Sequence, residues 1–148
     1  MLDAVQYCLT VQETLVKAKW SPGLLEHPGA ALVESDRGDV IYRGLRVRMG
    51  IHMLPSNESV VCREHPVTHR IVYAGKGVYV AQDVADAAAG GQILLSNTVH
   101  TEIKPHLSTI GQPKMMPFSL LQTDGEAHQL YQIVPAGLPQ RLVNAKKS

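Results

Sequence analysis

The chain has 148 residues, of which 45% are hydrophobic and 18% charged, and its formal net charge is +1. We expect one hydrophobic core in a single domain over residues 1–144, followed by a flexible tail at residues 145–148. The near-neutral charge gives no electrostatic reason to bind nucleic acid or an acidic membrane. No apolar run is long enough to span a bilayer. Two cysteines, Cys8 and Cys62, predict the cytoplasm or another reducing intracellular compartment.

Apolar patterns define the elements expected in the first half of the chain. Helical spacing of apolar residues indicates helices, alternation indicates strands, and clusters of Ser, Asn, Asp and Pro indicate turns. The elements predicted in this way are a helix over Ala4–Trp20, a short helix capped by Ser21 with Pro22 in its first turn, a hairpin of residues 31–34 and 40–42, a strand from Leu45 to His52 with one buried face, and a surface loop over Pro55–Thr68.

The stretch from Arg70 to Ser96 has the clearest pattern. A short strand at Ile71–Tyr73 is followed by a glycine turn, an amphipathic helix, and a buried strand at Gln92–Ser96. Gly90 and Gly91 are expected to give the helix a left-handed end. The residues expected to form the buried stripe of the helix are Val78, Ala81, Val84, Ala85 and Ala88.

The last third of the chain is predicted to close the domain with two strands. Asn97 is expected to cap a short helix over Asn97–Glu102, and residues 104–116 show no regular pattern. Strands at Phe118–Gln122 and Gln129–Val134 are joined through a polar turn. Helices mixed with hairpins predict an α+β sandwich.

Four runs resemble the catalytic domain of class III adenylyl and guanylyl cyclases. The run from Tyr73 to Ser96, YAGKGVYVAQDVADAAAGGQILLS, is similar to the family segment written YFGPVVNxAARVxxAAHGGQVLLS and aligns without a gap. The run from Tyr42 to His52, YRGLRVRMGIH, is similar to a strand of algal and protist members. Ala4–Trp20 and Leu130–Arg141 also match, in family order. The resemblance implies the ferredoxin-like nucleotidyl cyclase fold.

The chemistry of this family needs metal ions. Forming a cyclic nucleotide requires an activated 3′-hydroxyl, an α-phosphate held in line, and neutralised charge on the leaving pyrophosphate. The resemblance implies two metal-binding aspartates, which lie on elements before the helix that corresponds to Ala4–Trp20. The sequence begins after these elements. We therefore expect a fold that lacks its first metal-binding strand, with no metal ligands and no cofactor.

Three further family positions carry other residues. The resemblance puts Tyr79 in place of the transition-state asparagine and Asp83 in place of the phosphate-binding arginine. These residues are four apart, so both should face the nucleotide from one side of the helix. Val72 replaces the residue that reads the purine and has no hydrogen-bonding side-chain atom. Because Asp83 also reverses the charge that would attract phosphate, we expect no catalytic residue.

Two local motifs have both a functional and a structural interpretation. The glycines and lysine at residues 75–77 precede a helix and could hold a phosphate, but the GxxxxGK[ST] spacing is absent and a tight turn is favoured. The residues Cys62, Glu64, His65 and His69 have side chains that can bind a metal. Without a second cysteine pair, a solvated loop is the favoured interpretation of this motif.

The expected lack of a first strand would leave an open sheet edge and exposed apolar surface. We expect another protein, or a second copy of the chain, to cover that edge by strand addition.

Three functions are compatible with the sequence. The favoured one is an inactive cyclase-like module that acts as a structural or regulatory subunit through protein contacts. The second is a fragment or subunit of a nucleotidyl cyclase that converts ATP or GTP to cAMP or cGMP with residues from another chain. The third is a ligand-binding sensor that keeps the pocket without the reaction.

Overall fold

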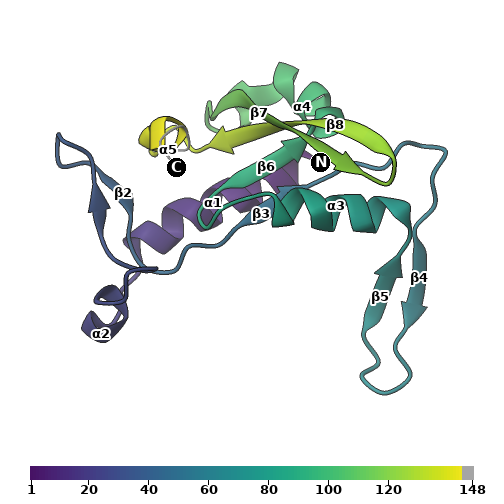
Figure 1. The fold of residues 1–148 in the computed structure, drawn as a ribbon, viewed down its shortest axis with the longest axis horizontal. Helices are drawn as coiled ribbons and strands as arrows, with labels where there is room; N and C mark the ends of the chain where they lie inside the picture. The colour runs from purple at the N-terminus through teal and green to yellow at the C-terminus, as the bar shows by residue number, and fades with distance from the viewer. Residues whose placement is uncertain (145–148) are drawn as a thin grey trace.

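The computed structural model describes residues 1–144 and is built on one four-stranded sheet (Figure 1). The strand order is β3-β6-β8-β7, with β3 parallel to β6 and the other neighbouring pairs antiparallel. The strands of this sheet are β3 (Met49–Ile51), β6 (Ile93–Ser96), β7 (Lys114–Thr123) and β8 (Glu126–Val134). The other strands are β1 (Val33–Glu34), β2 (Val40–Tyr42), β4 (Val61–Glu64) and β5 (Ile71–Ala74). The helices are α1 (Leu2–Lys17), α2 (Pro22–Leu25), α3 (Lys76–Asp86), α4 (Asn97–Ile103), the 3₁₀ helix η1 (Lys104–Ile110) and α5 (Gln140–Asn144).

Each face of the sheet has its own apolar core. Side chains of α1 and α4 pack on one face against Ile93, Leu95 and Ile133. Leu94 and Leu130 belong to the cluster on the other face, where they contact α3. Successive strand residues point to opposite faces, so Ile93, Leu94 and Leu95 of β6 are all apolar because both faces of the strand are covered. The buried strand predicted here is confirmed.

Helix α3 uses a buried stripe that differs from the predicted one. Its buried positions are Gly77, Val80 and Val84, and Ala88, two residues beyond the helix end, is buried on the same side. The predicted Val78, Ala81 and Ala85 are only half-buried. The buried stripe of Val80, Val84 and Ala88 packs against Leu94 and Leu130, while Ala85 lies to one side of it against Gly50 of β3.

The glycines after α3 act in the following turn and not as the helix cap. The helix ends at Asp86, and Gly91 alone of the glycine pair has a left-handed φ, of 88°. A Cβ added at Gly91 would also overlap the ring of Tyr42. Gly91 is therefore needed both for the backbone turn and for the close approach of β2.

The predicted strand from Leu45 to His52 is too long. Only β3 is a strand, and Leu45 and Val47 are 51% and 37% exposed. Before Met49 the segment is held by isolated bonds, since Gly91 N donates to Val47 O at 3.1 Å. Side-chain alternation was present here without a neighbouring strand to complete the ladder.

Helix α1 ends before the predicted Trp20 because side chains satisfy its last carbonyl groups. Trp20 Nε1 donates to Leu15 O at 2.8 Å, and Arg43 Nη1 donates to Val16 O and Ala18 O. Unpaired carbonyls at a helix end need such partners. The short helix α2 begins as predicted, with the Ser21 hydroxyl accepting from Leu24 N.

Two hairpins lie outside the main sheet. The β1–β2 hairpin is confirmed. The predicted loop Pro55–Thr68 is wrong in part, because it contains β4, which pairs with β5 to form a hairpin that projects from the body (Figure 1). Neither strand has a fully buried residue, so β4 has no apolar alternation by which the sequence could reveal it.

The last third follows the prediction with changes at element ends. Ser96, not Asn97, is the residue before α4, and its hydroxyl bonds other side chains instead of the helix end. Residues predicted to be irregular form η1 and the start of β7. The predicted tail at residues 145–148 lies outside the described residues. Of the helices in residues 1–144, none has the length and apolar character that crossing a membrane requires.

A buried arginine joins the C-terminal part of the chain to the body. Arg141 is 3% exposed and donates to Ile41 O at 2.9 Å, Gln12 Oε1 at 2.7 Å and Gly91 O at 3.1 Å. Its guanidinium carbon lies 4.4 Å from the centre of the Tyr42 ring. Burial lowers the pKa of Arg141, yet an arginine titrates so far above 7 that it stays charged. One side chain thus connects α5 with α1, β2 and the α3–β6 turn.

We expect Arg141→Met to lower the free energy of unfolding by about 3 kcal/mol, because three buried acceptors lose a charged donor. Urea denaturation measures this change. Arg37→Met, at an exposed position in the β1–β2 turn, is the control and should change the unfolding energy by less than about 0.5 kcal/mol. Equal effects of the two substitutions would contradict the role given to Arg141.

Candidate functional site

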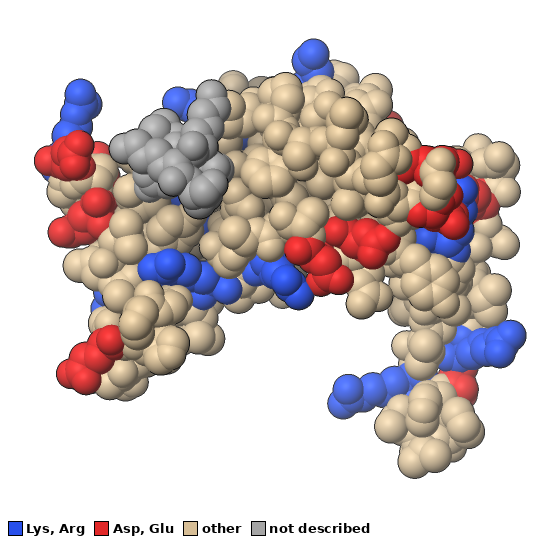
Figure 2. All heavy atoms as spheres, in the orientation of Figure 1, with Lys and Arg blue, Asp and Glu red and all other residues tan. Residues whose placement is uncertain are grey.

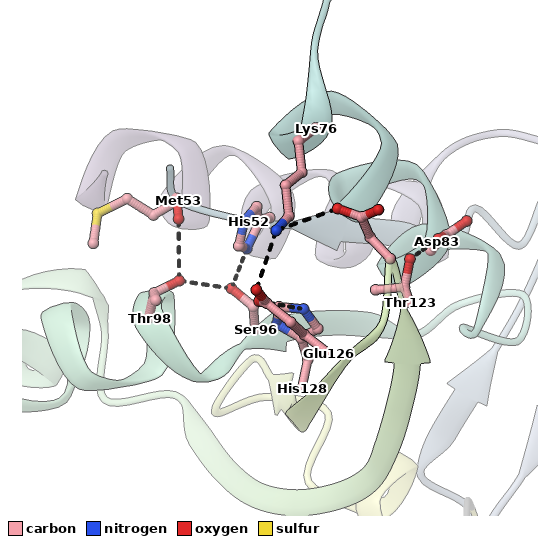
Figure 3. A network of polar contacts seen from close by, with 10 residues as sticks. His52, Met53, Lys76, Asp83, Ser96, Thr98, Thr123, Glu126 and His128 are labelled. Carbon is pink, nitrogen blue, oxygen red and sulfur yellow. Dashed lines mark hydrogen bonds and ion pairs between the residues drawn. The ribbon is translucent and has the colours of Figure 1, made fainter. Parts of the chain in front are cut away.

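An open pocket lies where α3 begins beside the β7–β8 turn. It has a volume of about 460 Å³ and is lined by Lys76, Tyr79, Thr123 and Asp124. Lys76 is the first residue of α3 and extends toward the turn (Figure 3). The pocket thus brings together two parts of the chain that are distant in sequence, including the lysine of the predicted glycine turn.

Two carboxylates hold the ammonium group of Lys76. Lys76 Nζ lies 3.1 Å from Glu126 Oε1 and 3.2 Å from Asp124 Oδ2. Hydrogen bonds to Glu126 and then to Asp124 raise the pKa of Lys76. Gly77 is also needed for packing, because a Cβ there would overlap Leu54. The tight turn predicted at residues 75–77 is therefore wrong in part: Gly75 precedes the helix, Lys76 and Gly77 begin α3, and the lysine already has partners.

The two helix positions singled out in the sequence lie in different surroundings. The Asp83 carboxylate accepts a hydrogen bond from the hydroxyl of Thr123, which is 9% exposed. Tyr79 is 63% exposed and lines the open pocket. The helix brings both residues close to the β7–β8 turn. Only Asp83 forms a hydrogen bond there, with Thr123 at the end of β7.

Val72 lies apart from this pair. It belongs to β5, on the projecting hairpin, and is 45% exposed. Its cross-strand partner is Arg63 of β4. Val72 is not among the residues that line the pocket.

The candidate metal-binding residues of the hairpin are engaged in its turn. His69 Nδ1 lies 2.7 Å from Glu64 Oε1, and His65 Nδ1 accepts from Val67 N and Thr68 N. Throughout residues 1–144, no three His, Cys, Asp or Glu side chains form a group that could hold a metal ion.

The structure also gathers polar side chains that sequence reasoning missed. His52, just after β3, lies 2.9 Å through Nδ1 from Ser96 Oγ at the end of β6. The ring of His128, in β8, is edge-on to that of His52 with 6.0 Å between centres. Burial and then the charge of His128 lower the pKa of His52, against a smaller opposite effect of Glu58. Histidines at strand ends were the only sequence signal, and the pairing depends on the strand order.

The sequence is similar to known adenylate cyclases. It is 38% identical over 109 residues to an adenylate cyclase of Mycosarcoma maydis, covering 74% of this chain and 4% of that protein. It is 33% identical over 125 residues to an adenylate cyclase of Neurospora crassa, covering 84% of this chain and 5% of that protein. The chain spans less than a tenth of the length of the curated relatives it matches. No protein-family profile matches the sequence.

The fold is that of solved cyclases. The structure of an adenylate cyclase from Trypanosoma brucei, described in its monomeric state, superposes with a TM-score of 0.70 at 21% identity, covering 95% of this chain and 64% of that chain. The predicted α+β cyclase fold is confirmed by this match. Since the sequence relatives and the fold agree, the chain belongs to the class III nucleotidyl cyclase catalytic domains.

Proposed function

We propose that this chain is a catalytically inactive member of the family and acts as a structural or regulatory subunit through contacts with another protein. One observation carries the proposal: the side chains at the α3 pocket bind one another. Lys76 is held by Asp124 and Glu126, and Asp83 is held by Thr123. Hydrogen bonds and ion pairs between side chains of the same pocket stabilise the fold, and they leave fewer polar groups free to bind a ligand.

The charge at this pocket opposes a nucleoside triphosphate. One positive side chain and three negative ones, Lys76 against Asp83, Asp124 and Glu126, give a net charge of −2. A triphosphate would have to displace carboxylates from Lys76 and approach Asp83, which stands where the family has an arginine. Like charges at such distances repel, so the pocket favours the state without nucleotide.

We expect the purified chain to form no cyclic nucleotide from ATP or GTP with manganese, and its melting temperature to stay within about 1 °C when nucleotide is added. Product chromatography and thermal unfolding measure these two quantities. Turnover by the chain alone would contradict the proposal. Stabilisation without turnover would instead support a nucleotide sensor.

A matched variant shows whether charge alone excludes the nucleotide. Asp124→Asn with Glu126→Gln frees Lys76 and changes the net charge from −2 to 0. If repulsion is the cause, this variant gains nucleotide-dependent stabilisation.

The bond between Asp83 and Thr123 should be measurable as a coupling between α3 and β7. We expect Asp83→Ala and Thr123→Val to each cost about 1 kcal/mol of unfolding free energy, and the double variant to cost about the same as either alone. A double-mutant cycle from urea denaturation gives the coupling. Additive losses would mean that the two side chains act independently.

The sheet offers one edge that suits a partner strand. At the β7 edge, Pro117 has no N–H to donate, and the register is irregular between Pro117 and Leu120. The β3 edge carries no proline, and among the described residues only β6 pairs with β3. In a parallel pair, only alternate residues of β3 form backbone hydrogen bonds with β6. The N–H and C=O groups of Gly50, between two such residues, therefore point away from β6 toward the open edge. Strand addition at β3, by another protein or a second copy, is therefore favoured over addition at β7.

The β4–β5 hairpin is the second proposed contact surface. Figure 2 shows basic atoms on both flanks of the projecting hairpin and other residue types over the rest of it. Its exposed apolar residues are Val61 (44%), Val67 (78%), Ile71 (63%), Val72 (45%) and Tyr73 (57%). Apolar residues gathered on one projecting element are typical of protein contact sites. The position that would read a purine, Val72, thus contributes to this surface.

We expect Tyr73→Ala to weaken the complex with the native partner about 30-fold, because an exposed tyrosine on a contact surface is a typical hot spot worth about 2 kcal/mol. The complex is isolated from the native source, its contacts are mapped by cross-linking, and its Kd is measured with purified components. Tyr7→Ala, at a tyrosine on α1 that is 67% exposed, should leave the Kd unchanged. A chain that stays monomeric and purifies alone would contradict the proposal.

A part in an active cyclase is the alternative. The relatives named adenylate cyclases, at 33% and 38% identity, favour it. In that case a complex with a complete cyclase domain would make cyclic nucleotide, and Lys76→Met in this chain would lower the rate. An unchanged rate would mean that this chain only regulates.

A further inference from the structure

The His52–His128 pair lies across three neighbouring strands, beside the Lys76 pocket (Figure 3). His52 follows β3, Ser96 ends β6, and His128 belongs to β8. Ser96 is 1% exposed and bonds His52 Nδ1 at 2.9 Å. The pair therefore connects the end of an edge strand to the interior of the sheet.

The directions of the hydrogen bonds show which ring nitrogen of His52 carries a proton. Thr98 Oγ1 donates to Met53 O at 3.3 Å, so it accepts from the Ser96 hydroxyl at 2.9 Å. Ser96 has then used its only proton and must accept from His52 Nδ1. His52 therefore carries a proton on Nδ1 in this network, and Nε2 is the atom that a second proton would join.

Charged groups around the pair come from the loop before β4, from β8 itself, from α3 and from the β7–β8 turn. Glu58, in the loop before β4, faces His52. Glu126 Oε2 lies 3.9 Å from His128 Nε2, a buried atom that has no hydrogen-bond partner among the described residues. The other oxygen of Glu126 binds Lys76, which also binds Asp124. Glu126 is therefore the carboxylate beside His128, whereas Glu58 is the carboxylate that acts on His52.

We propose that His52 and His128 form an acid-sensitive latch, which holds the end of β3 against β6 and α4 while His52 is neutral and releases it when both rings are protonated. Three features of β3 make release feasible. The strand has three residues, lies at the sheet edge, and pairs only with β6 within residues 1–144. Two positive rings 6.0 Å apart would repel each other across this short ladder.

The direction of the pH effect follows from the lowered pKa of His52. The unfolded chain binds a proton near pH 6.5, where the folded chain does not yet bind one. Stability from the latch is thus complete above about pH 6.5 and is lost as the pH falls toward the folded pKa. A partner on the β3 edge would dissociate in the same range. That last step rests on the proposed function, whereas the latch is a property of this chain alone.

Amide hydrogen exchange of the isolated full-length chain tests the latch without a partner. The amide of Met49, which donates to Gln92 O at 2.9 Å, reports on β3. We expect its protection factor to fall about tenfold between about pH 7.5 and pH 5.5, while that of Ile133 in β8 falls less than about twofold. Equal protection of Met49 at both pH values would overturn the proposal.

Variants identify the groups responsible. His52→Gln keeps an amide donor for Ser96 and cannot be protonated, so Met49 should keep its protection in acid. His128→Gln removes the second charge and should reduce the fall to less than about threefold. His100→Gln is needed because burial and Lys104 lower the pKa of His100 as well, and His106→Gln removes an exposed histidine. Both controls should behave as the wild type, and a full acid response in His52→Gln would refute the latch.

Discussion

The structure depends on how closely α3 lies on β3. A Cβ added at Gly50 would overlap the backbone of Ala85, so no other residue allows the helix this position. Because the helix lies so close, Val80 and Val84 pack with Leu94 and Leu130 in the core between α3 and the sheet. Their side chains are 2% and 0% exposed. Burial of such side chains contributes roughly 1.5 to 3 kcal/mol each. The β4–β5 hairpin, which leads into α3, and the pocket at its first turn both take their positions from this contact.

The position of α3 explains how Asp83 and Lys76 became part of the fold. Asp83 is directed at the end of β7, where the Thr123 hydroxyl supplies the donor that its carboxylate needs. Lys76, one turn before the exposed Tyr79, bridges the two carboxylates of the β7–β8 turn. The charged and polar groups at this pocket are thus paired with one another. Natural proteins commonly give up stability at active sites, so such pairing is consistent with the proposed inactive role.

Sequence reasoning succeeded where local chemistry determines the element. The run of apolar residues at Ile93–Ser96 predicted β6, and Ser21 before Pro22 predicted the start of α2. Sequence reasoning failed where pairing with another strand decides whether a segment is a strand. Leu45 and Val47 alternate like strand residues but have no strand to pair with. The opposite holds for β4, which is a strand because β5 lies beside it.

The candidate site shows the same limit. Tyr79 and Asp83 could be assigned to one side of a helix from their spacing alone. The contacts that each residue makes depend on the region around the β7–β8 turn. The partner of Asp83 in that region, Thr123, lies 40 residues further along the chain. His52 and Ser96 are 44 residues apart and meet only because β3 and β6 are parallel neighbours. Spacing predicts which side chains share a face, while topology decides which side chains they meet.

Side chains at both ends of the short strand β3 support its ladder with β6. Gln12 Nε2 donates to Val47 O at 2.8 Å just before the strand, while its Oε1 accepts from the buried Arg141. His52 binds Ser96 just after the strand. A three-residue edge strand would otherwise be among the first parts of a domain to open. Because the anchors come from α1, α5 and β6, and none of them uses the outer backbone edge, β3 can stay ordered while that edge is open to a partner. If a partner strand adds at β3, as proposed above, a change at any anchor would alter the surface on which it docks, and the interior of the protein would control that contact through β3.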